Sequence, residues 1–231
     1  MEQPQFLDQV AARLGRPRRH ASQIVKLNYR TNPWDSYCEG KTADDFCRIF
    51  QEALTSQSAK VIVVTDRNQM YEELQTVLEK GAVKRVAIWD DPRLNDLQLE
   101  SFFAEQGIAC TRWSGENDQR QLTMQVEASQ LGITWADAAC AETGTIVLQN
   151  RAGKGRLVSL LPQTHLVFVK KEQIHARWSG IMQEMHRMTE TNTLPSYTNF
   201  ISGPTTSADI ALEIVKGVHG PKHLVVMVVD F

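Results

Sequence analysis

The sequence contains no apolar run that approaches the ~20 residues needed to span a membrane as a helix. Residues 1–10 carry Glu2 and Asp8, where a secretion signal would have basic residues followed by an apolar stretch. We therefore expect a cytoplasmic protein with no membrane span.

Cysteine is scarce and scattered along the chain. The four cysteines, Cys38, Cys47, Cys110 and Cys140, form no C-x-x-C pair and no clustered spacing. This pattern argues against a disulfide framework and against a zinc or iron–sulfur site. We expect no metal on this chain, so any electron transfer would use a cofactor held elsewhere.

An excess of positive charge is missing as well. The 25 basic and 27 acidic residues give a formal charge of −2, whereas nucleic-acid affinity depends on a strongly basic surface. We therefore expect no nucleic-acid partner. One local basic cluster, either a solvated arm or a docking strip for an acidic partner, contains Arg13, Arg16, Arg18, Arg19 and His20.

Several catalytic and nucleotide-binding signatures are also absent. The chain has no G-x-G-x-x-G dinucleotide fingerprint, no zinc signature and no Ser-His-Asp order. The segment G-K-G-R at 153–156 lacks the spacing and the Ser/Thr of a P-loop. These absences argue against a nucleoside triphosphatase and against a dinucleotide-binding enzyme.

The hydrophobic pattern that is present predicts an α/β fold. With 231 residues, 42% of them hydrophobic, the chain can bury a full core. Up to about residue 110, helix-periodic segments such as 46–54 alternate with β-branched runs such as 61–65. Strand candidates at 132–134, 145–149 and 165–169 are separated by short loops, and the continuous apolar run at 224–229 predicts a strand covered on both faces. We therefore expect a mixed, mainly parallel sheet flanked by helices.

The chain divides into two parts on the same grounds. Residues 1–40 combine a short amphipathic piece with a polar segment that lacks regular periodicity, and we interpret them as an N-terminal arm that packs onto something else. Residues 41–231 then form one α/β domain. A helical face over 174–188 that is rich in methionine is assigned to core packing.

Segment 194–221 is the first candidate for an anion pocket. Residues 199–202 read as a buried strand that Gly203-Pro204 ends, and Thr206 with Asp209 fits the capping pattern of a helix over 208–215. The N–H groups and the dipole of such a helix start would favour a phosphate or a carboxylate. The alternative is an ordinary capped connection.

Three further side chains lie in turns where chemistry is plausible. Glu142 precedes a strand over 145–149 and is either a general base, a nucleophile, an anchor or only a turn cap. Arg156 lies in a glycine-rich basic loop and either clamps a carboxylate or belongs to a simple hairpin turn. His219, between two glycines, is either a titratable catalytic group or a turn residue.

Four motif regions occur in a specific order: F-L-D-Q-V-A-A-R-L-G-R-P at 6–17, G-I-T-W-A-D-A-A-C-A-E-T-G-T-I-V-L at 132–148, G-K-G-R-L-V-S-L-L-P at 153–162, and L-P-S-Y-T-N-F-I-S-G-P-T-T-S-A-D-I at 194–210 with G-V-H-G-P at 217–221. Together they resemble the lactate utilization protein C family, the small members of the lactate-utilization (LUD) domain group. The resemblance implies a fold similar to the ribose-phosphate isomerase and CoA-transferase-like superfamily.

The resemblance also implies a function. It suggests a role in oxidising L-lactate to pyruvate alongside two iron–sulfur proteins, lactate utilization proteins A and B, which would carry the clusters. This chain would then bind no cofactor of its own, and whether it is an enzyme by itself stays open.

Carried over position by position, the resemblance implies a pocket for a small carboxylate. Glu142 and His219 are its catalytic candidates. The ligand-binding candidates are Thr143, Gly144, Thr145, Gly155, Arg156, Gly203, Pro204, Thr205, Thr206, Ser207 and Asp209.

Two alternatives to the lactate role remain. One is a free-standing enzyme or binding module for a small phosphorylated or CoA-linked carboxylate, which the predicted helix start and Glu142 favour. The other is a non-catalytic assembly or regulatory module that docks through residues 1–40, with Trp34 and the arginines as the contact.

Overall fold

The computed structural model describes residues 3–19, 35–115, 118–207 and 215–231. The chain forms two compact units, Met1–Glu39 and Gly40–Phe231. The first unit contains the helices α1 (Gln3–Arg13) and α2 (Asp35–Cys38). In α1 only Ala11 is buried, and Arg18 pairs with Asp8 at 3.3 Å. The exposed apolar side chains of this unit are Phe6, Leu7, Val10 and Leu14.

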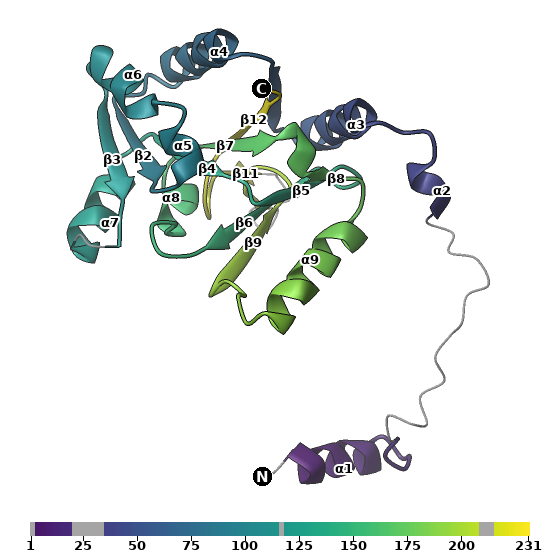
Figure 1. Ribbon diagram of the computed structural model, residues 1–231. Coiled ribbons are helices and arrows are strands. Elements are labelled where there is room, and N and C mark those ends of the chain that lie inside the picture. The colour runs from purple at the N-terminus through teal and green to yellow at the C-terminus, as the bar shows by residue number, and fades with distance from the viewer. Residues whose placement is uncertain (1–2, 20–34, 116–117, 208–214) are drawn as a thin grey trace. The chain divides into compact units, whose positions relative to one another are not determined.

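The second unit is built on a six-stranded sheet in which every strand pair is parallel (Figure 1). In spatial order its strands are β1 (Lys60–Val64), β12 (His223–Val229), β7 (Thr164–Lys170), β4 (Leu131–Trp135), β2 (Arg85–Trp89) and β3 (Ala109–Trp113). The apolar run of β12 is buried at every position after His223, as expected for an inner strand of a sheet that is covered on both faces.

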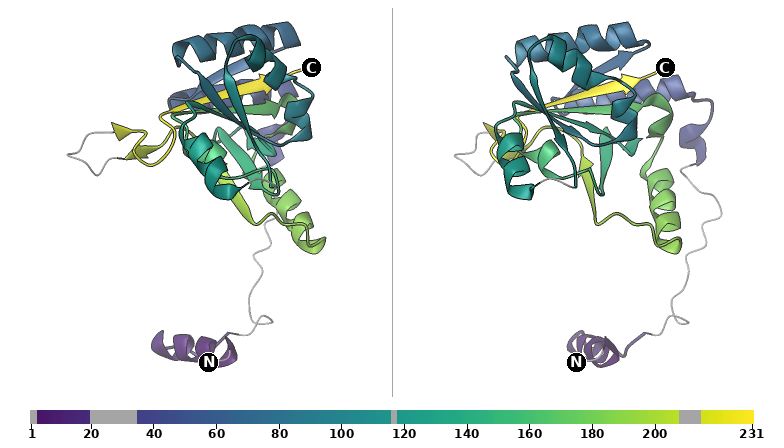
Figure 2. Two further views of the ribbon diagram at one scale, coloured as in Figure 1. Left: turned by 90° about the vertical axis from the view of Figure 1, so that its left-hand side faces the viewer. Right: turned by 60° about the vertical axis from the view of Figure 1, so that its left-hand side comes forward.

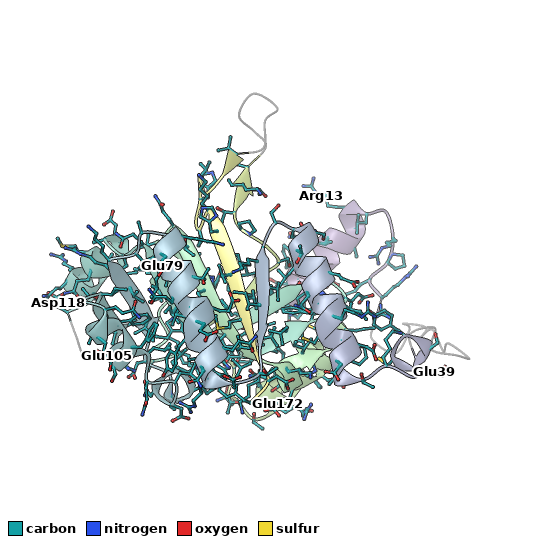
Figure 3. The ribbon with its side chains drawn as sticks, turned by 90° about the horizontal axis from the view of Figure 1, so that it is seen from above. Arg13, Glu39, Glu79, Glu105, Asp118 and Glu172 are labelled. Carbon is teal, nitrogen blue, oxygen red and sulfur yellow. The ribbon has the colours of Figure 1, made fainter. Side chains whose placement is uncertain are left out.

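Helices and a second sheet cover the two faces of the parallel sheet. The helices that connect or flank its strands are α3 (Ala43–Ser56), α4 (Arg67–Lys80), α5 (Pro92–Asn95), α6 (Leu99–Glu105), α7 (Gln119–Glu127) and α8 (Leu157–Leu160). Figure 1 shows α4 and α6 on one side of the sheet and α7, α8 and the second sheet on the other. Seen from above, α3 and α4 lie along either side of β1 (Figure 3).

Local sequence explains where the two long helices of the first half begin. Thr42 and Asp45 form a reciprocal capping box at the start of α3, and Asp66 accepts a hydrogen bond from the backbone N–H of Gln69 at the start of α4. Phe50 and Leu54 of α3 are fully buried. These positions belong to the helical face predicted over 46–54.

The second sheet has the order β8-β5-β6-β9 and mixes parallel and antiparallel pairs. Its strands are β8 (Ile174–His175), β5 (Ala138–Cys140), β6 (Thr145–Asn150) and β9 (Tyr197–Ile201). The 3₁₀ turn η2 (Lys171–Gln173) leads into β8, and α9 (Trp178–Glu190) packs on β5 through the buried Ile181. Ile174 therefore lies in a strand and not on the predicted helical face.

The fold class predicted from the sequence is confirmed, with one refinement. The parallel strands and the mixed strands belong to two separate sheets and do not form one mixed sheet. Among the described residues, no helix is both long enough and apolar enough to cross a membrane.

The predicted helix start at Thr206 is wrong. Thr206 and Ser207 form β10, which pairs antiparallel with Val215 and Lys216 of β11. Backbone bonds from Thr205 N–H to Pro221 (3.1 Å) and from Gly217 N–H to Thr205 (2.9 Å) extend this ribbon. Figure 2 shows β10 and β11 projecting away from the six-stranded sheet. Residues 208–214 of the predicted helix, with Asp209, lie outside the described residues, and its last residue, Val215, belongs to β11.

Candidate functional site

A small cavity of about 220 Å³ lies between the parallel sheet and β9. It is lined by Ser159 and Leu160 of α8, His165 of β7, residues 199–205, Pro221 and Leu224 of β12. His165 and Leu224 are register partners near the amino ends of their strands. Three of the predicted site residues, Gly203, Pro204 and Thr205, line this cavity.

His165 is the buried titratable group of the cavity. It is only 1% exposed, and its Nε2 lies 2.9 Å from the hydroxyl of the fully buried Thr134. Burial lowers the pKa of His165 to about 3, so the imidazole is neutral at physiological pH. Within the described part of the chain, Nδ1 has no hydrogen-bond partner, so the only bond of the ring is the one to Thr134.

A chain of hydroxyl groups leads from the protein surface to the cavity. The hydroxyl of the exposed Thr143 lies 2.7 Å from that of Thr145, which in turn lies 2.8 Å from that of Ser202. Thr145 is 1% exposed, and Ser202 lines the cavity. The hydroxyl chain therefore connects the predicted residues Thr143 and Thr145 to Ser202, which lines the cavity. Sequence reasoning did not single out Ser202.

The predicted glycines are explained by close packing of the backbone. A Cβ on Gly144, whose φ is +60°, would lie 2.7 Å from the backbone nitrogen of Leu54 in α3. A Cβ on Gly203 would lie 3.0 Å from the carbonyl oxygen of Gln57. Both glycines thus allow the second sheet and its exit segment to approach the C-terminal end of α3.

Glu142, the predicted base, is held by an arginine. Its carboxylate accepts two hydrogen bonds from Arg177, at 2.8 Å and 3.0 Å, and the two side chains are 32% and 20% exposed. His219 is exposed in the turn before β12, and no hydrogen bond or ion pair between described residues joins it to Glu142. The structure therefore does not bring the two predicted catalytic groups together in one hydrogen-bonded unit.

Arg156 remains an accessible cation. It is exposed, its guanidinium lies 5.0 Å from the centre of the Tyr197 ring, and it forms no ion pair with any described carboxylate. Asn199 and Ile201, which line the cavity, follow Tyr197 at two-residue steps along β9. Arg156 therefore lies against β9, the strand whose following residues, together with Phe200 and Ser202, line the cavity.

The loop that carries Gly155 docks onto the parallel sheet. A Cβ on Gly155 would lie 2.1 Å from the indole ring of Trp113, and Trp89 Nε1 donates to the carbonyl of Gly155 at 2.9 Å. Lys154, in the same loop, reaches Asp91 at 2.8 Å. Gly155 therefore serves packing, and Lys154 is already bound by carboxylates.

Sequence reasoning missed an ion cluster at the carboxyl ends of β2 and β4, in which Asp91 is buried and the other three side chains are partly exposed. Arg93 contacts Asp91 at 2.6 Å and Asp137 at 3.0 Å, and Lys154 contacts the same two carboxylates. The two cations also lie over the indole rings of Trp135 and Trp89, at 5.5 Å and 5.7 Å. The pair Asp90-Asp91, directly after the apolar run at 86–89, was the available signal.

The formal charges of the cluster balance, because two carboxylates pair with two cations. Burial by itself would raise the pKa of Asp91, which is 1% exposed, but hydrogen bonds from Arg93 and Lys154 and their charges hold it at about 2. We interpret the cluster as a structural joint between the two sheets. In the described part of the chain, no three His, Cys, Asp or Glu side chains gather as a metal site.

Comparisons with known proteins give one consistent result. The LUD domain family profile matches residues 47–229. Lactate utilization protein C of Shouchella clausii (strain KSM-K16) is 35% identical over 230 residues, which cover 97% of this chain and 96% of the relative. Lactate utilization protein C of Bacillus subtilis (strain 168) is 32% identical over 225 residues, with coverage of 95% and 92%.

Among solved structures, the chain is similar to a DUF162 family protein from Deinococcus radiodurans, determined at 1.70 Å resolution. The TM-score is 0.61 at 21% identity, and the match covers 82% of this chain and 99% of that one. At this level of identity the likeness concerns the fold alone.

Proposed function

The chain belongs to the LUD domain family, and from that premise we propose that it is a component of an L-lactate utilization system that acts with iron–sulfur partner proteins in the oxidation of L-lactate to pyruvate. The observation that carries the proposal is the 35% identity over 97% of this chain with a protein named lactate utilization protein C. The partners in this proposal are lactate utilization proteins A and B.

The proposal assigns the iron–sulfur clusters to the partners. Burial raises the pKa of Cys47, and burial together with the nearby Glu100 raises the pKa of Cys110 to about 12. Cluster ligation requires thiolates, which a raised pKa disfavours. The assignment rests on the scattered spacing of the four cysteines, and the raised pKa values of these two thiols agree with it.

The test is a lactate-oxidation assay with an artificial electron acceptor. Three samples are compared: the chain alone, the two iron–sulfur proteins without it, and the mixture of all three. The proposal requires lactate-dependent reduction of the acceptor that appears, or rises severalfold, only in the complete mixture. Equal rates with and without this chain would reject it.

Docking on the partners is proposed to use α1, whose exposed side chains include Phe6 and Val10. An amphipathic helix that buries only Ala11 in its own unit offers an apolar face to another protein. Replacing both Phe6 and Val10 by Ser should weaken co-purification of the partners, whereas Gln9→Ala on the same helix should not. Unchanged co-purification of the double variant would reject α1 as the docking element.

The alternative, a binder of a small phosphorylated or CoA-linked carboxylate, has lost one of its supports, because Thr206 begins a strand and not a helix. It retains Arg156 as an exposed cation against Tyr197 of β9. Turnover of such a carboxylate by the isolated chain, with none of lactate, would favour this alternative.

A further inference from the structure

The cavity beside His165 contains two hydrogen-bonding groups that can each act as a donor or as an acceptor. The hydrogen bond between His165 and Thr134 can form with either tautomer of the imidazole. When Nε2–H donates to the hydroxyl of Thr134, Nδ1 is free to accept. When the hydroxyl of Thr134 donates to Nε2, Nδ1–H is free to donate. Ser202 has the same freedom, because either oxygen of the Ser202–Thr145 and Thr145–Thr143 pairs can donate.

The cavity is also uncharged over its described walls. Its described lining residues include no Lys, Arg, Asp or Glu, and His165 is neutral at physiological pH. Its volume of about 220 Å³ is below the roughly 300–1,000 Å³ of sites for drug-sized ligands. These properties suit the uncharged end of a small molecule.

We propose that this cavity binds the oxygen-bearing end of a small hydroxy or oxo compound, and that His165 and Ser202 accept both redox forms by exchanging donor and acceptor roles. A hydroxyl group donates to Nδ1 of one tautomer of His165. A carbonyl oxygen accepts from Nδ1–H of the other. The cavity thus fits an alcohol and the ketone derived from it without a change of side chain.

Arg156 lies outside the cavity lining, and it is the exposed cation against β9 that we assign to a ligand carboxylate at the rim of the cavity. The guanidinium stacks on Tyr197, which precedes the cavity-lining Asn199 by two residues on the same face of β9, a spacing of roughly 7 Å along a strand. L-lactate and pyruvate are a pair of such acids, in which the carboxylate is bonded to the carbon that carries the hydroxyl or carbonyl oxygen. The choice of this pair rests on the proposed function, whereas the cavity argument does not.

The experiment follows the imidazole nitrogens of His165 by NMR in the full chain labelled with ¹⁵N-histidine. Five compounds are titrated. L-lactate and pyruvate are the two redox forms, and propionate lacks the oxygen on the second carbon. Propan-2-ol and acetone are the matched uncharged alcohol and ketone. We expect lactate to favour the Nε2–H tautomer and pyruvate the Nδ1–H tautomer. Propionate should bind about tenfold more weakly, since it leaves the polar groups unpaired.

Three variants test the individual contacts. Ser202→Ala should weaken lactate and pyruvate binding about tenfold, whereas Ser101→Ala, at an exposed serine of α6 outside the cavity lining, should leave both affinities unchanged. Arg156→Gln should weaken the two acids but not propan-2-ol or acetone. Ser202→Ala avoids the folding risk of replacing the buried His165.

The outcomes separate this inference from the proposed function. If the complete mixture oxidises lactate but the His165 signals do not move with any probe, the cavity proposal fails and the lactate role stands. If the signals move with propan-2-ol and acetone while lactate is neither bound nor oxidised, the cavity proposal stands and the lactate role fails. Unchanged lactate affinity in Ser202→Ala overturns the assignment of Ser202.

Discussion

Replacing Asp91 by Asn should destabilise the fold more than any other single change of an acidic side chain described above. Asp91 is 1% exposed and is bound by both Arg93 and Lys154. Its removal leaves two cations that share only Asp137. Removing one partner of a buried ion pair typically lowers the free energy of unfolding by about 3–5 kcal/mol. For Asp91→Asn we expect a decrease of about 3 kcal/mol at pH 7.

Part of this stabilisation must depend on pH. The pKa of Asp91 is about 2 in the fold against 3.8 for a free carboxyl group, and at 1.36 kcal/mol per pH unit the difference corresponds to about 2 kcal/mol. Because the pKa is lowered by folding, this contribution is complete above pH 3.8 and disappears as the pH falls toward 2. The stability advantage of the native chain over Asp91→Asn should therefore shrink between pH 4 and pH 2.5.

The assay is urea denaturation followed by tryptophan fluorescence, repeated from pH 7 to pH 2.5. The matched control is Asp90→Asn, since the neighbouring Asp90 is 46% exposed and pairs with Arg112 at the surface. Exposed pairs contribute less than about 1 kcal/mol. The interpretation of the cluster as a structural joint is refuted if the two variants lose the same stability at pH 7, or if the advantage over Asp91→Asn does not change with pH.

Three further predictions concern packing and charge. Gly155→Ala should lower the free energy of unfolding by about 2 kcal/mol, because the new methyl group would overlap the indole of Trp113. Thermal melts test this, with Gly115→Ala as the control. A Cβ on Gly115 meets no atom within 4 Å, so that variant should change the melting temperature little. The contribution of His165 to the unfolding free energy should fall by about 1.4 kcal/mol for each pH unit below 6.5, because unfolded His165 takes up a proton that the fold excludes down to about pH 3; a variant without this histidine should lose that component in the same pH series. Glu142→Gln should lower stability by less than about 1 kcal/mol and should retain most of the lactate oxidation in the complete mixture, whereas a hundredfold loss of rate would restore Glu142 as the general base.

The sequence predicted the elements whose signals are local. The helix α3 follows from apolar residues at helical spacing, of which Phe50 and Leu54 are fully buried, and β12 follows from one unbroken apolar run. The separation into two sheets could not be predicted, because a strand pattern does not say which strand is the neighbour. Thr206 shows the same limit: a capping pattern is local, but pairing with Lys216 decides its conformation.

The site was predicted in part for the same reason. Gly203 and Thr145 do lie at or next to the cavity wall, since a strand end rich in hydroxyl groups is visible in the sequence. The partners of Glu142 and Lys154 were not visible, because Arg177 and Asp91 come from distant parts of the chain. His165 was predicted only as part of a strand, although a histidine inside an apolar run is a signal for a buried polar contact.

The position of β12 between β1 and β7 has a consequence for how the chain is made. β1 begins at Lys60, and the neighbour with which it pairs among the described strands begins at His223, 163 residues later. At a synthesis rate of about 5–20 residues per second, roughly 8–33 s pass on the ribosome before that neighbour exists. During this time β1 has no strand to pair with, and the apolar faces of α3 and α4 stay exposed. We therefore expect chaperones to bind nascent chains of this protein until β12 emerges.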